Sequence, residues 1–101
     1  MAGLLPFTGR RYKGWDAVSI PVFDEVNDSY LVVVVGWEGD RRRIYHNLLH
    51  IDIINSKIWI QRDGTEDGIG FALEEAGIPK EDIVPAFHPA DVRPFTGYAV
   101  A

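Results

Sequence analysis

Apolar residues in the first two thirds of the chain occur in short alternating or continuous runs, separated by residues that favour turns. This pattern predicts four strands, over residues 17–24, 30–37, 42–54 and 57–62. Turn-forming residues lie between the runs and tolerate the backbone conformations of tight connections: Asn27 and Asp28, Gly39, and Asn55 and Ser56. The short connections favour an antiparallel β-meander.

Three of these predicted strands carry more specific information. Pro21 has no N–H group to donate to a neighbouring strand, which favours an edge position or a bulge for residues 17–24. Residues 31–35 are all apolar, which is typical of a strand covered on both faces. Either the domain itself covers both faces, or a helix covers one face and a partner subunit covers the other. Residues 42–54 are long for one strand, so we expect a bulge or bend within them. A regular strand here would carry on one face Ile44, His46, Leu48, His50 and Asp52.

The period of the pattern changes after residue 62. Residues 69, 72, 73 and 76 are apolar at helical spacing, which predicts a helix over residues 66–76 with Thr65 as its N-cap. Gly77, Ile78 and Pro79 form a typical helix stop, and Pro79 is expected to begin a short turn.

The C-terminal part is rich in proline, and residues 95–100 are predicted to form a last strand. The expected fold is therefore α+β, an antiparallel sheet of four to five strands packed with one main helix. We expect a single domain over residues 17–101, preceded by an irregular segment over residues 1–16 in which glycine and proline prevent a regular helix.

Charge is distributed unevenly over the 101 residues, which carry 10 Lys and Arg against 15 Asp and Glu. Residues 63–91 contain eight acidic side chains and one basic one, Lys80, whereas residues 1–62 are close to neutral. An acidic surface repels phosphate and attracts basic protein surfaces, so this half favours a protein partner over duplex DNA. The alternative is a solvated face that keeps the domain soluble. We expect a cytoplasmic protein, because the longest apolar run is far shorter than a membrane span and no secretory signal is visible.

The sequence offers little catalytic chemistry. It has no cysteine, no nucleophile-elbow motif and no phosphate-binding loop, and we expect neither an enzyme nor a cofactor. His50 and Asp52 lie two residues apart on one strand face and are expected to touch, but no third metal ligand has suitable spacing. A small metal-assisted hydrolase using His50, Asp52 and Asp63 is kept as an alternative.

Candidate interaction residues gather around the predicted hairpins. Arg41, Arg42 and Arg43 lie at a hairpin tip, where they suit a protein contact or self-pairing with the acidic segment. Direct nucleic-acid binding is the alternative, with help from Arg10, Arg11 and Lys13, although three arginines are few for strong non-specific DNA binding. Three nearby aromatic residues are either interface anchors or core residues: Trp37, Tyr45 and Trp59.

Several sequence motifs occur along the chain in one unbroken order. They are Gly36-Trp37, Arg42-Arg43-Ile44-Tyr45, His50-Ile51-Asp52-Ile53, residues 57–66, residues 77–84, Phe87-His88-Pro89 and residues 95–100. Taken together, these motifs resemble those of the XisI family, the cyanobacterial fdxN-element excision controlling factors. The resemblance covers residues 17–101.

The resemblance implies an accessory role in site-specific excision of a DNA element. Family members act with a partner called XisH, which resembles endonuclease folds, and with a separate recombinase. The family has no established active site, so the resemblance implies no catalytic residue and a role exerted through protein contact, in excision or more broadly in regulating a nuclease-like partner.

One feature departs from the family pattern. Relatives usually open with an amphipathic helix before the first strand, whereas residues 1–16 contain Gly and Pro at positions that such a helix does not tolerate. We expect a truncated or variant form, or a sheet face that something else covers. In the latter case residues 31–35 would expose a patch that favours a homo-oligomer.

Overall fold

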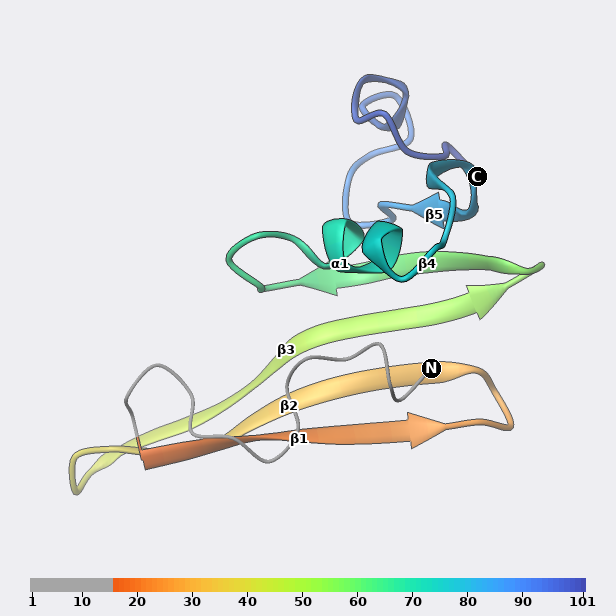
Figure 1. Ribbon diagram of the computed structural model, residues 1–101. Helices are drawn as coiled ribbons and strands as arrows, with labels where there is room; N and C mark the ends of the chain where they lie inside the picture. Colours follow the sequence, from red (N-terminus) through yellow and green to blue (C-terminus); the bar gives the residue numbers. More distant parts are fainter. Residues whose placement is uncertain (1–15) are drawn as a thin grey trace.

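Residues 16–101 are described by the computed structural model, and they form one five-stranded sheet with a short helix on one side (Figure 1). The strands are adjacent in chain order: β1 (Asp16–Asp24), β2 (Ser29–Glu38), β3 (Arg42–Ile54), β4 (Lys57–Asp63) and β5 (Ile83–Val84). The first four form the predicted antiparallel meander, and β5 pairs parallel to β4. The helical elements are α1 (Ile69–Glu75) and the two 3-10 helices η2 (Lys80–Asp82) and η3 (Arg93–Phe95). The α+β class is confirmed.

The two ends of the described chain differ from the prediction. β1 begins at Asp16, one residue before its predicted start, and residues 1–15 of the predicted irregular segment lie outside the described residues. The last strand predicted over residues 95–100 is wrong. Gly97 has a positive φ of 85°, and the Tyr98 N–H donates to the Thr96 hydroxyl rather than to a strand. The fifth strand is instead β5, which forms where η2 ends.

α1 begins later than predicted, and Thr65 does not cap it. Gly68 precedes the helix with a φ of 81°, a conformation that is not helical and that leaves residues 66–68 in a loop. The Asp63 carboxylate supports this loop from the end of β4. Its Oδ2 accepts the Ile69 N–H at 2.7 Å, while its Oδ1 accepts the Thr65 N–H at 3.0 Å and also the Thr65 hydroxyl. Asp63 therefore takes the role that the sequence pattern assigned to Thr65.

The predicted helix stop is confirmed. Gly77 has a φ of 96°, its N–H donates to the Glu74 carbonyl, and the Ile78 N–H reaches back to the Leu73 carbonyl at 3.1 Å. Pro79 then precedes η2, as expected for a proline that begins a short turn.

The bulge predicted within β3 is confirmed, at Leu48. Val32 pairs with Leu49 whereas Val33 pairs with Asn47, so Leu48 is the extra residue. An extra residue reverses which side of the sheet the following side chains face. The prediction that His46 shares a face with His50 is therefore wrong, while His50 and Asp52 remain together.

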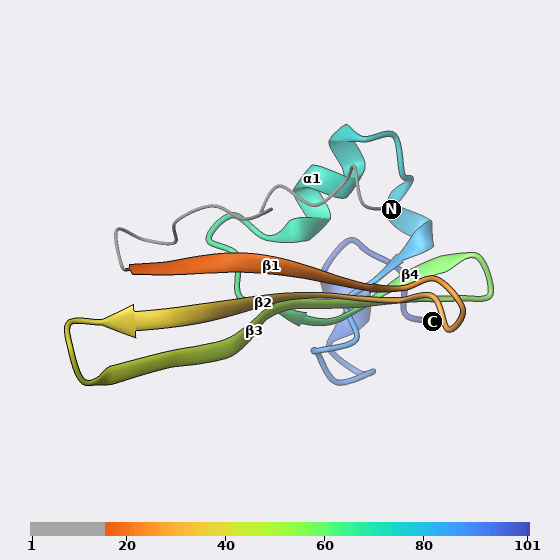
Figure 2. The same cartoon turned by 90° about the horizontal axis from the view of Figure 1, so that it is seen from below.

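The core lies on the α1 side of the sheet, which we call the helix face. Its buried members include Tyr30, Val32, Val34, Ile44, Leu48, Leu49, Ile51, Ile58, Ile60, Ile69, Leu73 and Ile83. The alternate residues of β2, Leu31, Val33 and Val35, are only half-buried, so within the described residues this strand is covered on one face. Figure 2 shows α1 on one side of the sheet and part of the segment after β5 on the other.

The two sheet edges are finished differently. β1 is an edge strand, as Pro21 predicts. At the other edge the chain folds back, and the Ala99 N–H donates to the Ile83 carbonyl at 2.9 Å. None of the helices in residues 16–101 has the length and apolar character needed to cross a membrane.

Candidate functional site

The side of β1, β2 and β3 that faces away from α1 forms an apolar surface, which we call the open face. The strand register arranges its middle as three cross-strand rows: Val18, Val35 and Tyr45; Ile20, Val33 and Asn47; and Val22, Leu31 and His50. The β1 members of these rows are all exposed, and Tyr45 is 70% exposed. A contiguous apolar area of this kind marks an interaction surface more often than an isolated exposed side chain does.

The predicted aromatic anchors divide into two environments. Trp37 is 44% exposed at one end of the open face, and the Arg43 guanidinium carbon lies 5.1 Å from the centroid of its ring. Trp59 is half-buried on β4, where Arg93 from the C-terminal segment lies 5.7 Å from its ring centroid. Trp37 and Tyr45 are therefore accessible to a partner, whereas Trp59 is partly covered by its own chain.

The three arginines at the β2–β3 turn do not act as one free cationic patch. Arg43 is stacked on Trp37 and donates from Nη1 to the Gly36 carbonyl at 3.4 Å. Arg42 lies 3.7 Å from Glu38 in an exposed ion pair. Arg41 is exposed in the turn itself. Their predicted role as a contact patch stays a prediction.

A polar cluster lies at one end of the open face, on β2, β3 and β4. The Ser29 hydroxyl donates to Asp52 Oδ1 at 2.6 Å, and His50 Nε2 lies 3.1 Å from the same oxygen. Gln61 Nε2 donates to Asp52 Oδ2 at 3.2 Å. The expected contact between His50 and Asp52 is confirmed. Ser29 and Gln61 could not be placed from sequence, because only the strand register brings them to Asp52.

Asp52 is the centre of this cluster. Burial of its carboxylate raises the pKa, but the bonds from Ser29, His50 and Gln61 outweigh burial and leave the pKa of Asp52 below its ordinary value. The carboxylate is therefore held ionised as a shared hydrogen-bond acceptor.

The cluster does not have the geometry of a serine–histidine–carboxylate relay. In such a relay the two imidazole nitrogens separate the hydroxyl from the carboxylate. Here one nitrogen, His50 Nε2, faces both groups, at 3.3 Å from Ser29 Oγ and 3.1 Å from Asp52 Oδ1. Ser29 also donates to Asp52 directly, so the imidazole does not lie between the hydroxyl and the carboxylate.

Asp63 belongs to a different part of the structure. It pairs with Leu49 on the helix face, opposite to the side of His50, and its carboxylate is occupied by the loop before α1. The structure thus separates Asp63 from His50 and Asp52. Among residues 16–101 no group of three or more histidine, aspartate or glutamate side chains is arranged to hold a metal ion.

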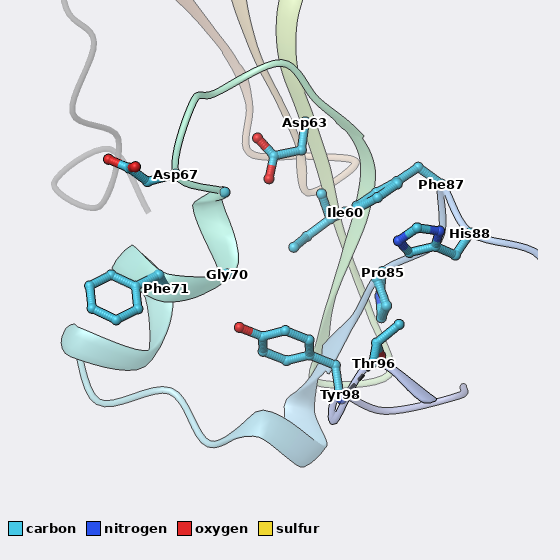
Figure 3. A pocket seen from close by; sticks show the side chains of 11 residues that line it. Ile60, Asp63, Asp67, Gly70, Phe71, Pro85, Phe87, His88, Thr96 and Tyr98 are labelled. Atoms are coloured by element: carbon cyan, nitrogen blue, oxygen red, sulfur yellow. Dashed lines mark hydrogen bonds between the residues drawn. The ribbon is translucent and has the colours of Figure 1, made fainter. Parts of the chain in front are cut away.

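A cavity of about 320 Å³ opens between α1, β4 and the C-terminal segment (Figure 3). Its lining combines apolar and acidic side chains and includes Ile60, Asp63, Asp67, Phe71, Phe87 and Tyr98. Asp67 is exposed, and Phe71 is 59% exposed. The sequence pattern gave no sign of this cavity, because its walls come from three segments that are distant in the chain.

Tyr98 closes one wall of the cavity. Its hydroxyl donates to Glu74 Oε2 at 2.6 Å, and Lys80 Nζ lies 3.7 Å from the other carboxylate oxygen. The hydrogen bond to Glu74, together with burial, raises the pKa of Tyr98 to about 12. The tyrosine therefore remains neutral at ordinary pH and acts as a donor.

These features define a small α+β domain built on a five-stranded, mostly antiparallel sheet. The family model described as XisI protein matches residues 10–100, and the chain belongs to the XisI family. The match starts before residue 17, where the resemblance predicted from the sequence begins.

Two solved structures from Anabaena variabilis are similar along most of the chain. One, a XisI-like protein, is 33% identical with a TM-score of 0.78, covering 90% of this chain and 83% of its own. The other, the fdxN element excision controlling factor XisI, is 35% identical with a TM-score of 0.71, covering 90% and 81%. A comparison with curated proteins found no match.

Proposed function

We propose that this chain is a non-catalytic accessory factor that controls excision of a DNA element through contact with a nuclease-fold partner resembling XisH. The observation that carries the proposal is the likeness to the fdxN element excision controlling factor XisI over 90% of the chain. The hydrogen-bond geometry around Asp52 supports a non-catalytic role, because the hydroxyl and the imidazole share one carboxylate oxygen and form no relay.

The surface best suited to this partner is the acidic side around the cavity. Residues 63–91 carry eight acidic groups and one basic group. Exposed Phe71 and Asp67 line the cavity, as does the apolar side chain of Ile60. An aromatic group at the rim of an apolar hollow, surrounded by negative charge, suits a partner surface that presents basic and apolar side chains.

Titration calorimetry with a XisH-like protein from the same organism tests the proposal. The intact chain is expected to bind, and Phe71→Ala is expected to weaken binding at least about tenfold, as for a central aromatic contact. Phe95→Ala is the matched control, because Phe95 is 88% exposed and does not line the cavity. Absence of binding by the intact chain, or equal losses in the two variants, would contradict the proposal.

Charge variants examine the electrostatic part of the contact. Asp67→Asn is expected to slow association and reduce its dependence on salt. Asp40→Asn, which changes another exposed acid at the distant β2–β3 turn, is expected to have little effect.

The two alternatives have their own readouts. Direct binding of duplex DNA through Arg41, Arg42 and Arg43 would give an affinity that falls steeply with salt and drops when all three become alanine. A hydrolase would cleave DNA with a divalent metal and lose that activity in Asp52→Asn. We expect neither result, and either one would overturn the non-catalytic, protein-binding role.

A further inference from the structure

The open face has no cover from residues 16–101 over β1, β2 and the first half of β3. On β4 the situation differs, because Arg93 lies over Trp59 and the C-terminal segment occupies that side of the sheet. The uncovered part presents Ile20, Val22 and Tyr45 to solvent along with the half-buried alternate residues of β2. Leaving this much aliphatic surface in water is unfavourable.

The edges of the sheet are poorly suited to extension by another strand. At the β1 edge Pro21 lacks the N–H that a new neighbouring strand would need. At the β5 edge the Ile83 carbonyl already accepts the Ala99 N–H. Association of the sheet is therefore expected through its face.

The open face has an internal symmetry along the strand direction. Its central row is Ile20, Val33 and Asn47, with one apolar row on each side. Beyond these, one end row is Asp16, Trp37 and Arg43, and the opposite end row is Asp24, Ser29 and Asp52. Arg43 and Asp52 thus stand two rows from Asn47 in opposite directions.

On β3 this order is complementary to a reversed copy of itself, because a cation lies at one end and an anion at the other. A two-fold axis in the plane of the face, perpendicular to the strands, would lay β3 on β3 of a second copy. The central rows would then meet, and each Arg43 would lie above an Asp52 of the other copy. At the outer edge, on β1, each Asp16 would lie above an Asp24 of the other copy, so the favourable charge contact is confined to β3. The ionised state of Asp52 suits such a contact, and the pairing would occur twice because a two-fold interface is self-complementary.

We propose that the open face is the interface of a reversible, two-fold symmetric homodimer in which the apolar rows pack face to face and Arg43 of each copy meets Asp52 of the other. This goes beyond the proposed function, which uses the acidic side of the molecule. Three strands over five rows give a flat footprint of about 14 by 26 Å, or on the order of 400 Å². Stable interfaces bury about 800 Å² of accessible surface per partner, so this dimer is expected to be concentration-dependent.

Sedimentation equilibrium of the full chain, over about a hundredfold range of protein concentration, measures the dimer directly. The wild type is expected to pass from monomer to dimer within this range. Val33→Glu places a charge in the centre of the face and is expected to give a monomer throughout. Val26→Glu is the matched control, because Val26 is 92% exposed in the β1–β2 turn and lies off the face, and it is expected to dimerise like the wild type.

The charge contact has a separate test. Arg43→Glu is expected to weaken the dimer at least about tenfold, whereas Arg41→Glu, in the turn, is expected to change it less than about threefold. Circular dichroism and thermal unfolding show whether each variant is folded. If Val33→Glu does not fold, Tyr45→Glu, at a 70% exposed position of the same face, replaces it.

Three results would overturn the proposal. They are a wild-type chain that stays monomeric at every concentration, a dimer that survives both Tyr45→Glu and Val33→Glu, and a monomer whose binding to the XisH-like partner is lost in these variants, which would assign the face to that partner. Failure here and failure of the proposed function are distinguishable. A monomer that binds the partner through Phe71 contradicts only the dimer, and a dimer that binds no partner contradicts only the accessory role.

Discussion

The Tyr98 hydroxyl donates a 2.6 Å hydrogen bond to the Glu74 carboxylate, which joins the C-terminal segment to α1 across 24 residues of sequence. Gly70 lies beneath this contact. A Cβ atom at Gly70 would be 2.9 Å from the Tyr98 hydroxyl oxygen, so the bond depends on the absence of a side chain there. The contact fixes one wall of the cavity and the position of the last residues of the chain.

Tyr98→Phe is expected to destabilise the domain by about 1–2 kcal/mol, because it removes a hydrogen bond to a charged group. Glu74 would keep its 3.7 Å ion pair with Lys80. Urea unfolding measures this difference. Tyr45→Phe, at an exposed position, is the control and is expected to change stability by less than about 0.5 kcal/mol. Equal stability of Tyr98→Phe and the wild type would show that the contact contributes nothing.

The same bond predicts a loss of stability at alkaline pH. The pKa of Tyr98 is raised to about 12 in the folded chain, against about 10 when unfolded. Between these values the unfolded chain loses the phenolic proton while the folded chain keeps it. Stability from this group is therefore complete below about pH 10 and declines as pH rises toward 12. The slope should be shallower in Tyr98→Phe, as followed by unfolding across this range.

Gly36→Ala is expected to be strongly destabilising, by more than about 3 kcal/mol, because the new methyl group has no space. Its Cβ would lie 2.3 Å from the Asp16 carbonyl oxygen and 2.4 Å from the Ala17 Cα, both backbone atoms of β1. The outcome would be a locally unpaired β1, visible as faster amide hydrogen exchange in that strand. Gly39→Asn, in the open β2–β3 turn, is the control, since asparagine tolerates a positive φ.

Asp63→Ala is expected to destabilise the domain by about 1–3 kcal/mol, because the loop before α1 loses the acceptor of two backbone N–H groups and one hydroxyl. Chemical denaturation provides the measurement. Asp91→Ala, an exposed acid in the same acidic half, should behave like the wild type. A variant of Asp63 with unchanged stability would mean that water replaces the carboxylate at no cost.

Asp52→Asn tests the polar cluster through acid unfolding. The hydrogen bonds that lower the pKa of Asp52 stabilise its ionised form, so this stability is present above about pH 4 and is lost as pH falls through the lower, folded-state pKa. Asp52→Asn cannot ionise and is expected to be less stable at neutral pH by about 1 kcal/mol, with a smaller further loss in acid. If the free energy of unfolding fell with pH in the same way in Asp52→Asn and the wild type, this account would be contradicted.

Local patterns predicted the elements of the sheet well. The four meander strands, their tight turns and the edge position of β1 all follow from alternation, turn residues and Pro21, which act within a few residues of chain. The length of β3 predicted a bulge but not its position. Only pairing with β2 places the extra residue at Leu48, and this position decides that His46 and His50 face opposite sides.

Prediction failed where a contact distant in sequence replaced a local one. Thr65 is a good capping residue by type, yet Asp63 holds the α1 loop because the end of β4 lies against it. Residues 95–100 have the composition of a strand but form none. Arg93 lies over the Trp59 ring and Tyr98 donates to Glu74, and these two distant contacts hold the segment in another conformation.

The sequence by itself determined the class of fold, the family and the uneven charge. These follow from composition, from hydrophobic periods of two or about four residues, and from the order of motifs along the chain. The tertiary structure alone decided which side of β2 is open, that Ser29 and Gln61 join His50 at Asp52, and that Asp63 lies on the other face. Side chains reach each other through strand register, and one inserted residue in a strand reverses every face that follows it.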